Sequence, residues 1–322
     1  MCILFLYVAK EGGTLANSSF PRLKLVIASN RDESYLRPTK TANFWDSDPT
    51  ILAGQDCLEG GTWLGITKTG KLAILLNIMS KPPAIKLKSR GELVTGFLRS
   101  SPALRGWTYC NNLYQADIRK QFGLFNLVTI DLQKSESGQQ QERYARQTLP
   151  ESSSSSLKAS FDVTYFTNGS ESGPRTLSNE GESQFYAFGN SVYDSPFCKV
   201  TDGCREFEEI INSHINSDPA TREGNETLKG NLLKFLKSAT KHYPDAQIDK
   251  QARDAGIINP VSELTSVFVT TPEKANYGTR THTIIIIDSA DDVNYHEWTM
   301  EEPINIKSPN WIESQYNFKL TK

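Results

Sequence analysis

The second residue of the chain, Cys2, places a thiol where removal of Met1 would leave a free α-amine on the same residue. That amine, with an unperturbed pKa of about 7.7–8.0, is one of the few groups that accept a proton near neutral pH, and a deprotonated thiol is a strong nucleophile. Together they form a self-contained catalyst for attack on a carbonyl. The alternative is a small apolar residue at the start of a buried strand, since buried cysteine is usually structural.

Four consecutive polar residues, Asn30-Arg31-Asp32-Glu33, follow the apolar run Leu23 to Ala28 and place charge at the end of a predicted strand. Strand alternation assigns Asn30 and Asp32 to one face, and Arg31 and Glu33 to the other. Asp32 is therefore a candidate to hold an N-terminal ammonium or to orient its amine, while Arg31 and Glu33 pair with each other or with the following loop. The alternative is a solvated turn.

Three more polar residues lie where strands begin or turn. Asn77 closes an apolar strand and Asn190 follows Gly189, so each amide can point into a cleft, or it can bond to local backbone instead. Arg280 begins the most apolar predicted strand of the C-terminal half and can anchor a carboxylate or phosphate. Its alternative is an exposed cation at a strand start.

Metal and nucleotide sites are not predicted. The four histidines have no metal-binding spacing, and five cysteines without a Cys-x-x-Cys pair favour reduced thiols in a cytosolic setting over disulfides or a thiolate metal site. The segment Gly60-Gly-Thr-Trp-Leu-Gly65 lacks the Lys-Ser/Thr of a phosphate loop and opens a strand, so its glycines are interpreted as tight-turn residues.

Charge and hydropathy exclude two further classes of partner. Lys plus Arg total 35 against 37 Asp plus Glu, and the resulting net charge of −2 provides no global field for nucleic acid or an anionic membrane. No stretch approaches the ~18 apolar residues of a membrane helix. The opening apolar run lacks a preceding basic residue and a cleavage site, so it is predicted to be the first strand rather than a signal peptide.

Apolar runs of strand length recur along the chain and supply enough strands for two sheets. They are Cys2 to Ala9, Leu23 to Ser29, Trp63 to Thr67, Leu72 to Ile78, Leu124 to Leu132, Phe161 to Phe166, Ser266 to Thr270 and Thr281 to Asp288. The third and fourth runs are separated by a short segment containing Gly70, which predicts a hairpin.

Helices are predicted at three segments, two of them behind capping residues. They are Arg90 to Ser100 behind a Ser89-x-x-Glu92 capping box, Cys204 to Ile215 behind Asp202, and Leu228 to His242. Few helices and many strands predict helices on the outer faces of a two-sheet sandwich within one domain, residues 1–322. The polar stretch 134–160 is predicted to be an insertion loop.

The combination of Met1-Cys2-Ile, Ser29-Asn-Arg-Asp-Glu33, Gly60-Gly-Thr-Trp-Leu-Gly65 and Gly189-Asn-Ser-Val-Tyr-Asp-Ser-Pro196 resembles the NRDE family. The similarity runs from residue 1 to about residue 285. This family in turn resembles N-terminal-nucleophile hydrolases of the cholylglycine hydrolase and penicillin V acylase type, which implies an α+β fold with a four-layer α-β-β-α sandwich.

The resemblance also implies site roles. Asp32 is similar to the aspartate that contacts the N-terminal amine, Asn77 and Asn190 to the oxyanion donors, and Arg280 to an arginine beside the thiolate. One departure stands out, because the hydrolases carry arginine three residues before that aspartate and this chain has Ser29 there. Arg31 is not expected to replace it, since it faces away from Asp32. Hydrolysis is therefore the less favoured activity.

The family is implicated in haem and lipid homeostasis, in Golgi organisation and in secretory transport. The resemblance thus implies a cytoplasmic protein, associated with mitochondria or Golgi, that carries or regulates a small amphipathic ligand. Haem or an acyl compound is the candidate ligand, no cofactor is required, and the cofactor-binding residues stay unassigned. The alternative is an N-terminal cysteine hydrolase acting on an acyl amide or thioester, with Cys2 as nucleophile.

Overall fold

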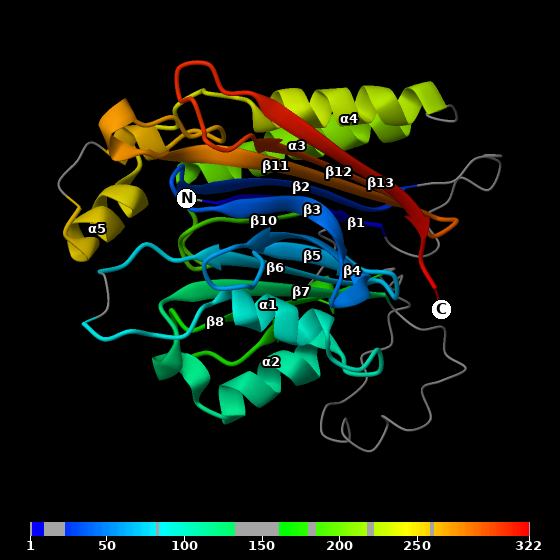
Figure 1. Cartoon of the computed structure of the whole chain (residues 1–322), viewed down its shortest axis with the longest axis horizontal. Helices are drawn as coiled ribbons and strands as arrows, with labels where there is room; N and C mark the ends of the chain where they lie inside the picture. Colours follow the sequence, from blue (N-terminus) through cyan, green and yellow to red (C-terminus); the bar gives the residue numbers. More distant parts are fainter. Residues whose placement is uncertain are drawn as a thin grey trace.

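Four layers in the order α-β-β-α make up the described part of the chain (Figure 1). The computed structural model describes residues 2–9, 23–81, 84–132, 161–179, 185–217, 222–257 and 261–321. The predicted fold class, α+β with a four-layer α-β-β-α sandwich, is confirmed. The predicted insertion at 134–160 lies outside the described residues.

The first sheet carries the N-terminal strand next to one edge, and all of its neighbouring strands pair antiparallel. From edge to edge its strands are β10 (Phe185–Phe188), β1 (Ile3–Val8), β2 (Leu23–Ser34), β11 (Tyr277–Asp288), β12 (Asp292–Met300) and β13 (Trp311–Lys319). Because β1 lies between β10 and β2, the start of the chain is held on both sides.

The second sheet is antiparallel as well and contains the predicted hairpin. Its order is β3 (Thr39–Trp45), β4 (Asp48–Asp56), β5 (Leu64–Thr67), β6 (Lys71–Asn77), β7 (Phe125–Leu132), β8 (Phe161–Thr167) and β9 (Arg175–Thr176). Gly70, with φ of +83°, makes the turn between β5 and β6, a conformation that favours glycine.

Helices cover the two outer faces of the sandwich. They are α1 (Gly91–Leu98) and α2 (Gly106–Gln115) on the second sheet, α3 (Cys198–Asn216) and α4 (Arg222–Leu236) on the first, and α5 (Ala246–Ala255) at the end of the molecule near the N-terminus. Short 3₁₀ turns lie at Ile118–Gln121, Leu177–Asn179, Val261–Leu264 and Glu273–Ala275.

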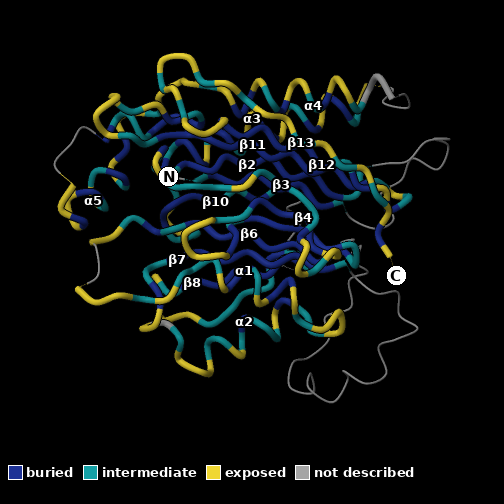
Figure 2. The backbone as a smooth tube through the Cα atoms, viewed as in Figure 1, coloured by how far each residue is buried: buried dark blue, intermediate teal, exposed yellow. Residues whose placement is uncertain are grey.

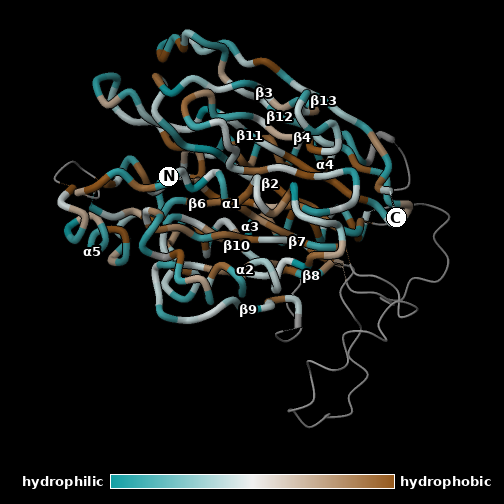
Figure 3. Tube along the Cα trace, turned by 60° about the horizontal axis from the view of Figure 1, so that its bottom comes forward, coloured by the Kyte–Doolittle hydropathy of each residue, from teal (hydrophilic) through white to brown (hydrophobic). Residues whose placement is uncertain are grey.

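Alternation along β1 and β2 divides their side chains between two cores. Leu6 and Ile27 pack between the sheets, whereas Phe5 and Val26 pack under α3 and α4. Buried and apolar segments accordingly concentrate in the two sheets, as Figures 2 and 3 show. The face on which a residue of β2 lies therefore decides whether it meets the second sheet or the helices.

The remaining predicted elements need correction. Residues Ser266–Thr270 do not form a strand, and Thr270 makes only an isolated bridge to Gly278. The capping box is wrong, because α1 has Arg90 at its N-cap without a side-chain hydrogen bond. Likewise α3 begins at Cys198, so Asp202 lies within the helix rather than at its start.

Gly61 of the glycine-rich segment allows close backbone approach to α1. A Cβ added there would lie 2.8 Å from the carbonyl carbon of Gly91, and backbone gives way less easily than a side chain. We expect Gly61→Ala to lower the free energy of unfolding by about 1–3 kcal/mol in chemical denaturation. Gly230→Ala is the control, because nothing lies within 4 Å of its added Cβ and alanine favours a helix. Equal stability of the two variants would contradict this role for Gly61.

Candidate functional site

Cys2 lies directly before β1, at the meeting of two cavities. One has a volume of about 1090 Å³ and the other about 760 Å³, and Cys2, Asn77 and Met79 line both. The Cys2 side chain is half-buried against the core between the sheets, and its Sγ lies 3.8 Å from the carbonyl oxygen of Asp32. The predicted nucleophile therefore has room for a ligand beside it.

Asn30, the first residue of the polar block, ties the sheet to its helical cover. Its Nδ2 donates to the carbonyl oxygens of Leu236 and Val267, at 2.8 and 2.9 Å, and its Oδ1 lies 2.7 Å from Nδ1 of His282. All of these contacts lie on the helix-facing side of β2. Asn30 is therefore a structural residue that fixes the strand on which Arg31 and Asp32 stand.

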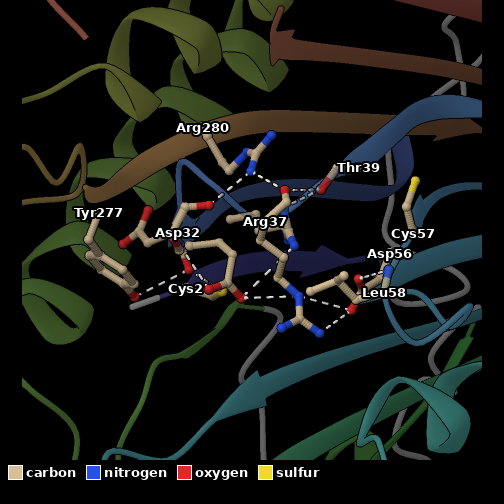
Figure 4. Close-up of polar contacts among 12 residues, drawn as sticks. Cys2, Asp32, Arg37, Thr39, Asp56, Cys57, Leu58, Tyr277 and Arg280 are labelled. Atoms are coloured by element: carbon tan, nitrogen blue, oxygen red, sulfur yellow. Dashed lines mark hydrogen bonds and ion pairs between the residues drawn. The ribbon is translucent and has the colours of Figure 1, made fainter. Parts of the chain in front are cut away.

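Asp32 is almost fully buried and held by groups from β11. Its Oδ1 accepts a 2.6 Å hydrogen bond from the Thr279 hydroxyl, and its carbonyl oxygen accepts one of 3.2 Å from the Tyr277 hydroxyl. Figure 4 shows Asp32 with Tyr277 and Cys2 close by. Asp32 lines the smaller cavity together with Cys2, and its predicted contact with the Cys2 amine stays a prediction.

Arg31 lies on the same side as Cys2, which corrects the expectation from sequence. The positions one and three residues before Asp32 have the same parity, so Arg31 and Ser29 share a face of β2. Arg31 lines the larger cavity with Cys2, its guanidinium lies 4.1 Å from the centre of the Trp63 ring, and its Nη1 donates to the Thr39 hydroxyl at 3.2 Å. Arg31 does face away from Asp32, as expected, but it was wrong to conclude from this that Arg31 has no place beside the thiol.

Burial and nearby charges act on the Cys2 thiol in opposite directions. Burial is the main cause that raises the pKa of Cys2, and Asp32 raises it further, whereas the cation of Arg31 lowers it. The net shift is upward. The thiol is therefore mostly protonated at neutral pH unless a base or a bound ligand removes the proton.

Asn190 and Asn77 come together, and both line the smaller cavity. The Asn190 Nδ2 donates to the backbone carbonyl of Asn77, which fixes the orientation of the Asn190 amide. The Asn190 Oδ1 is buried and has no hydrogen-bond partner within the described part of the chain. Asn190 lines the smaller cavity. It thus presents a hydrogen-bond acceptor as well as its remaining amide hydrogen.

Arg280 does not line either of the two cavities, as far as the described residues show. It is fully buried, and its Nη1 donates to the carbonyl oxygens of Ser34 and Arg37 at 2.9 and 2.6 Å, while its Nη2 contacts Glu302 at 2.5 Å. It does anchor a carboxylate, but that carboxylate belongs to the chain. A register shift between Thr279 and Thr281 leaves Arg280 without a partner residue in the pairing of β11 with β2.

Sequence reasoning missed several groups of the larger cavity. Arg90, read as a helix start, lines it and donates to the Leu124 carbonyl at 3.0 Å. Arg37 also lines it and bonds through Nε to Asp56 at 3.0 Å, with Glu33 at 4.0 Å. The short Asn-Arg-Asp-Glu block gave no signal for Arg37 or Arg90, because turns between distant strands bring these two residues to the larger cavity.

Two further properties concern metals and membranes. Across the described residues, no group of three or more His, Cys, Asp and Glu side chains is placed to hold a metal ion. The helices in that same part of the chain all fall short of the length and apolar character that crossing a bilayer requires.

Comparison with known proteins gives relatives over nearly the whole chain. The human transport and Golgi organization protein 2 homolog is 30% identical over 305 residues, 92% of this chain and 93% of the relative. The Drosophila melanogaster transport and Golgi organization protein 2 is 29% identical over 283 residues, 86% of each chain. Among solved structures, the C2A mutant of the conjugated bile acid hydrolase from Clostridium perfringens is 10% identical, with a TM-score of 0.33 and coverage of 100% and 97%.

The family model of Transport and Golgi organisation 2 matches residues 1–302. That range includes β1, the polar block of β2, both asparagines and Arg280. The chain therefore belongs to the Transport and Golgi organisation 2 family.

Proposed function

We propose that the protein binds a small amphipathic ligand in the two cavities that meet at Cys2, as a carrier or regulator. The observation that carries this proposal is the contrast between their walls. Ile257, Leu264 and Tyr277 line the smaller cavity but not the larger, whereas Arg31 and Arg90 line the larger but not the smaller. The smaller volume, about 760 Å³, is within the range of small-molecule sites, and the larger, about 1090 Å³, lies at its upper limit.

Two ligand classes match this contrast, acyl compounds and haem. An acyl chain would lie on the apolar wall, with its polar end toward Arg31. Haem would need an axial donor, and Cys2 and Met79 are the sulfur-bearing residues of the cavity walls, whereas no histidine of the described residues lines either cavity. Cys2 is therefore the proposed axial ligand if haem is bound.

The names of the relatives give the cellular setting of the proposal. Because the related proteins are named for transport and Golgi organisation, their names support a Golgi-linked setting. A cytoplasmic protein that also associates with mitochondria is the finer proposal, and it rests on the family resemblance alone. There, ligand exchange at the Cys2 cavities would support lipid or haem homeostasis and secretory transport.

Leu264→Asn tests the apolar wall. The change keeps the side-chain size but replaces apolar contact by a polar amide, so we expect at least about tenfold weaker binding of a fluorescent long-chain acyl amide in a fluorescence titration. Ile312→Asn is the control, because Ile312 is exposed on β13 and lines neither cavity. Haem is titrated separately by absorption, where Cys2→Ala should weaken binding and shift the spectrum. If the wild type binds neither probe, the proposal fails.

Hydrolysis is a second candidate function, because Arg31 lies on the same side as Cys2 and lines the larger cavity with it. In this reaction the Cys2 sulfur would attack the carbonyl carbon of an acyl amide or thioester, and its proton would pass through the α-amine to the leaving amine or thiol. Water would then cleave the acyl–sulfur bond, releasing the acid and restoring the thiol. A remaining amide hydrogen of Asn190, with Asn77, would stabilise the oxyanion.

A further inference from the structure

Three exposed apolar side chains lie in, or next in sequence to, the lining of the larger cavity. Leu36, Ile85 and Leu58 are 76%, 69% and 61% exposed, more than any other large apolar side chain of the described residues. Ile85 lines the cavity itself, Leu36 precedes the lining residue Arg37, and Leu58 lies between the lining residues Asp56 and Glu59. Exposed apolar side chains are normally scattered singly over a protein surface, so a group of them near one cavity marks a contact surface.

Two turns hold these side chains at one edge of the cavity. The Cys57 amide donates to the Pro38 carbonyl at 3.0 Å, and the Leu58 amide donates to Asp56 Oδ1 at 3.0 Å. Figure 4 shows Leu58 beside Asp56 and Arg37. Since these turns are tied by hydrogen bonds, Leu36 and Leu58 are presented by a fixed support.

The same mouth is cationic, although the chain as a whole has a net charge of −2. Exposed Lys81, Lys86 and Lys88 line it, and the sequence from 78 to 91 contains no Asp or Glu. Glu59 and Asp254 are the exposed carboxylates of the lining. In total the lining has six cations (Arg31, Arg37, Lys81, Lys86, Lys88 and Arg90) and four carboxylates (Glu33, Asp56, Glu59 and Asp254), so positive charge is in excess.

We infer that this mouth, defined by Leu36, Leu58, Ile85, Lys86 and Lys88, docks on an anionic lipid bilayer. Apolar side chains enter the boundary between headgroups and acyl chains, and lysines gain from the negative surface potential. The inference rests on the proposed function, because an amphipathic ligand resides in a bilayer and would reach Cys2 without crossing water. The charge complementarity favours a bilayer over an apolar protein partner.

Flotation with lipid vesicles tests the inference on the full chain. Vesicles of phosphatidylcholine with phosphatidylserine are expected to bind the wild type, and vesicles of phosphatidylcholine alone to bind it much more weakly. Lys86→Gln with Lys88→Gln should weaken binding about 25-fold, since each lysine near an anionic surface contributes roughly a factor of five. Combined Leu36→Ser, Leu58→Ser and Ile85→Ser should weaken it at least about tenfold.

Matched variants away from the mouth separate docking from general surface effects. Trp107→Ser with Ile312→Ser, and Lys307→Gln with Lys319→Gln, should float as the wild type does. No binding of the wild type, equal binding to both kinds of vesicle, or unchanged binding of the mouth variants overturns the inference. The acyl amide is titrated in parallel, without vesicles, against Leu36→Ser with Leu58→Ser, because these two residues line neither cavity. Retained affinity of this variant shows that the proposed function stands when docking fails.

Discussion

Replacing Arg280 with methionine is expected to lower the free energy of unfolding by about 3–5 kcal/mol, the range for breaking a buried charge pair. Methionine fills much of the same volume but removes the donors to Ser34, Arg37 and Glu302. The two carbonyl oxygens would lose donors in a buried setting, and an unsatisfied buried acceptor is costly. Chemical denaturation measures the change. Because Glu302 is 34% exposed and can regain water, the lower end of the range is favoured.

Arg205→Met is the control for the Arg280 prediction. Arg205 pairs with Asp202 but is 75% exposed, so its loss should change stability by less than about 0.5 kcal/mol. The contrast also tests function. If Arg280→Met were stable yet bound the acyl amide much more weakly, Arg280 would be a ligand anchor, as its place at the start of a predicted strand suggested, and the structural role would be wrong.

The strands with simple apolar patterns could be predicted from sequence, and those with polar inner faces could not. β11 was identified because Ile284 to Ile287 are all apolar. β12 was missed because Glu297 interrupts its pattern, yet that side chain is buried and accepts from the Ala42 amide at 2.7 Å and the Tyr295 hydroxyl at 3.1 Å. A polar residue satisfied by distant partners leaves no local signal.

The false strand at Ser266–Thr270 shows the reverse error. Val267 and Val269 are buried, but the segment forms no continuous ladder with a neighbouring strand. The Val269 carbonyl accepts from the Thr279 amide of β11 at 2.9 Å and the Phe268 amide donates to the Ser238 carbonyl at 2.8 Å, while other backbone groups pair with side chains. The Ser266 carbonyl accepts from Lys199 and the Val267 carbonyl from Asn30, while the Val269 amide donates to the Thr279 hydroxyl. Periodicity detects burial, and it cannot tell which groups satisfy the backbone.

For the site, sequence placed Cys2, Asp32 and Asn190 near one another but missed the cavity's shape. Strand alternation gave the right face for each residue of β2, and the error over Arg31 came from comparing it with Asp32 instead of with Cys2. The contact of Asn190 with the Asn77 carbonyl joins segments 113 residues apart, so no local pattern contains it. Position along one strand was predictable, whereas contacts across the sandwich were not.

Cys2→Ala is expected to remove turnover of an acyl amide or thioester by about a thousandfold or more, if the protein hydrolyses either substrate. The nucleophile is required in the transition state and contributes little to ground-state binding, so affinity for the acyl amide should stay within a few-fold of the wild type. Cys57→Ala is the matched control, because Cys57 is an exposed free thiol that lines neither cavity. Product release and equilibrium binding are measured on the same preparations.

The comparison of Cys2→Ala with the wild type requires protein whose N-terminal residue has been determined. Intact mass should show a chain that begins at Cys2, since retention of Met1 removes the α-amine that accepts the thiol proton, and burial already disfavours the thiolate by raising the pKa of Cys2. In a chain that begins at Cys2, a kcat of about 1 per second or more that Cys2→Ala abolishes would place hydrolysis ahead of carriage. A carrier gives the opposite result: the wild type and Cys2→Ala bind the acyl amide with similar affinity, and neither releases product.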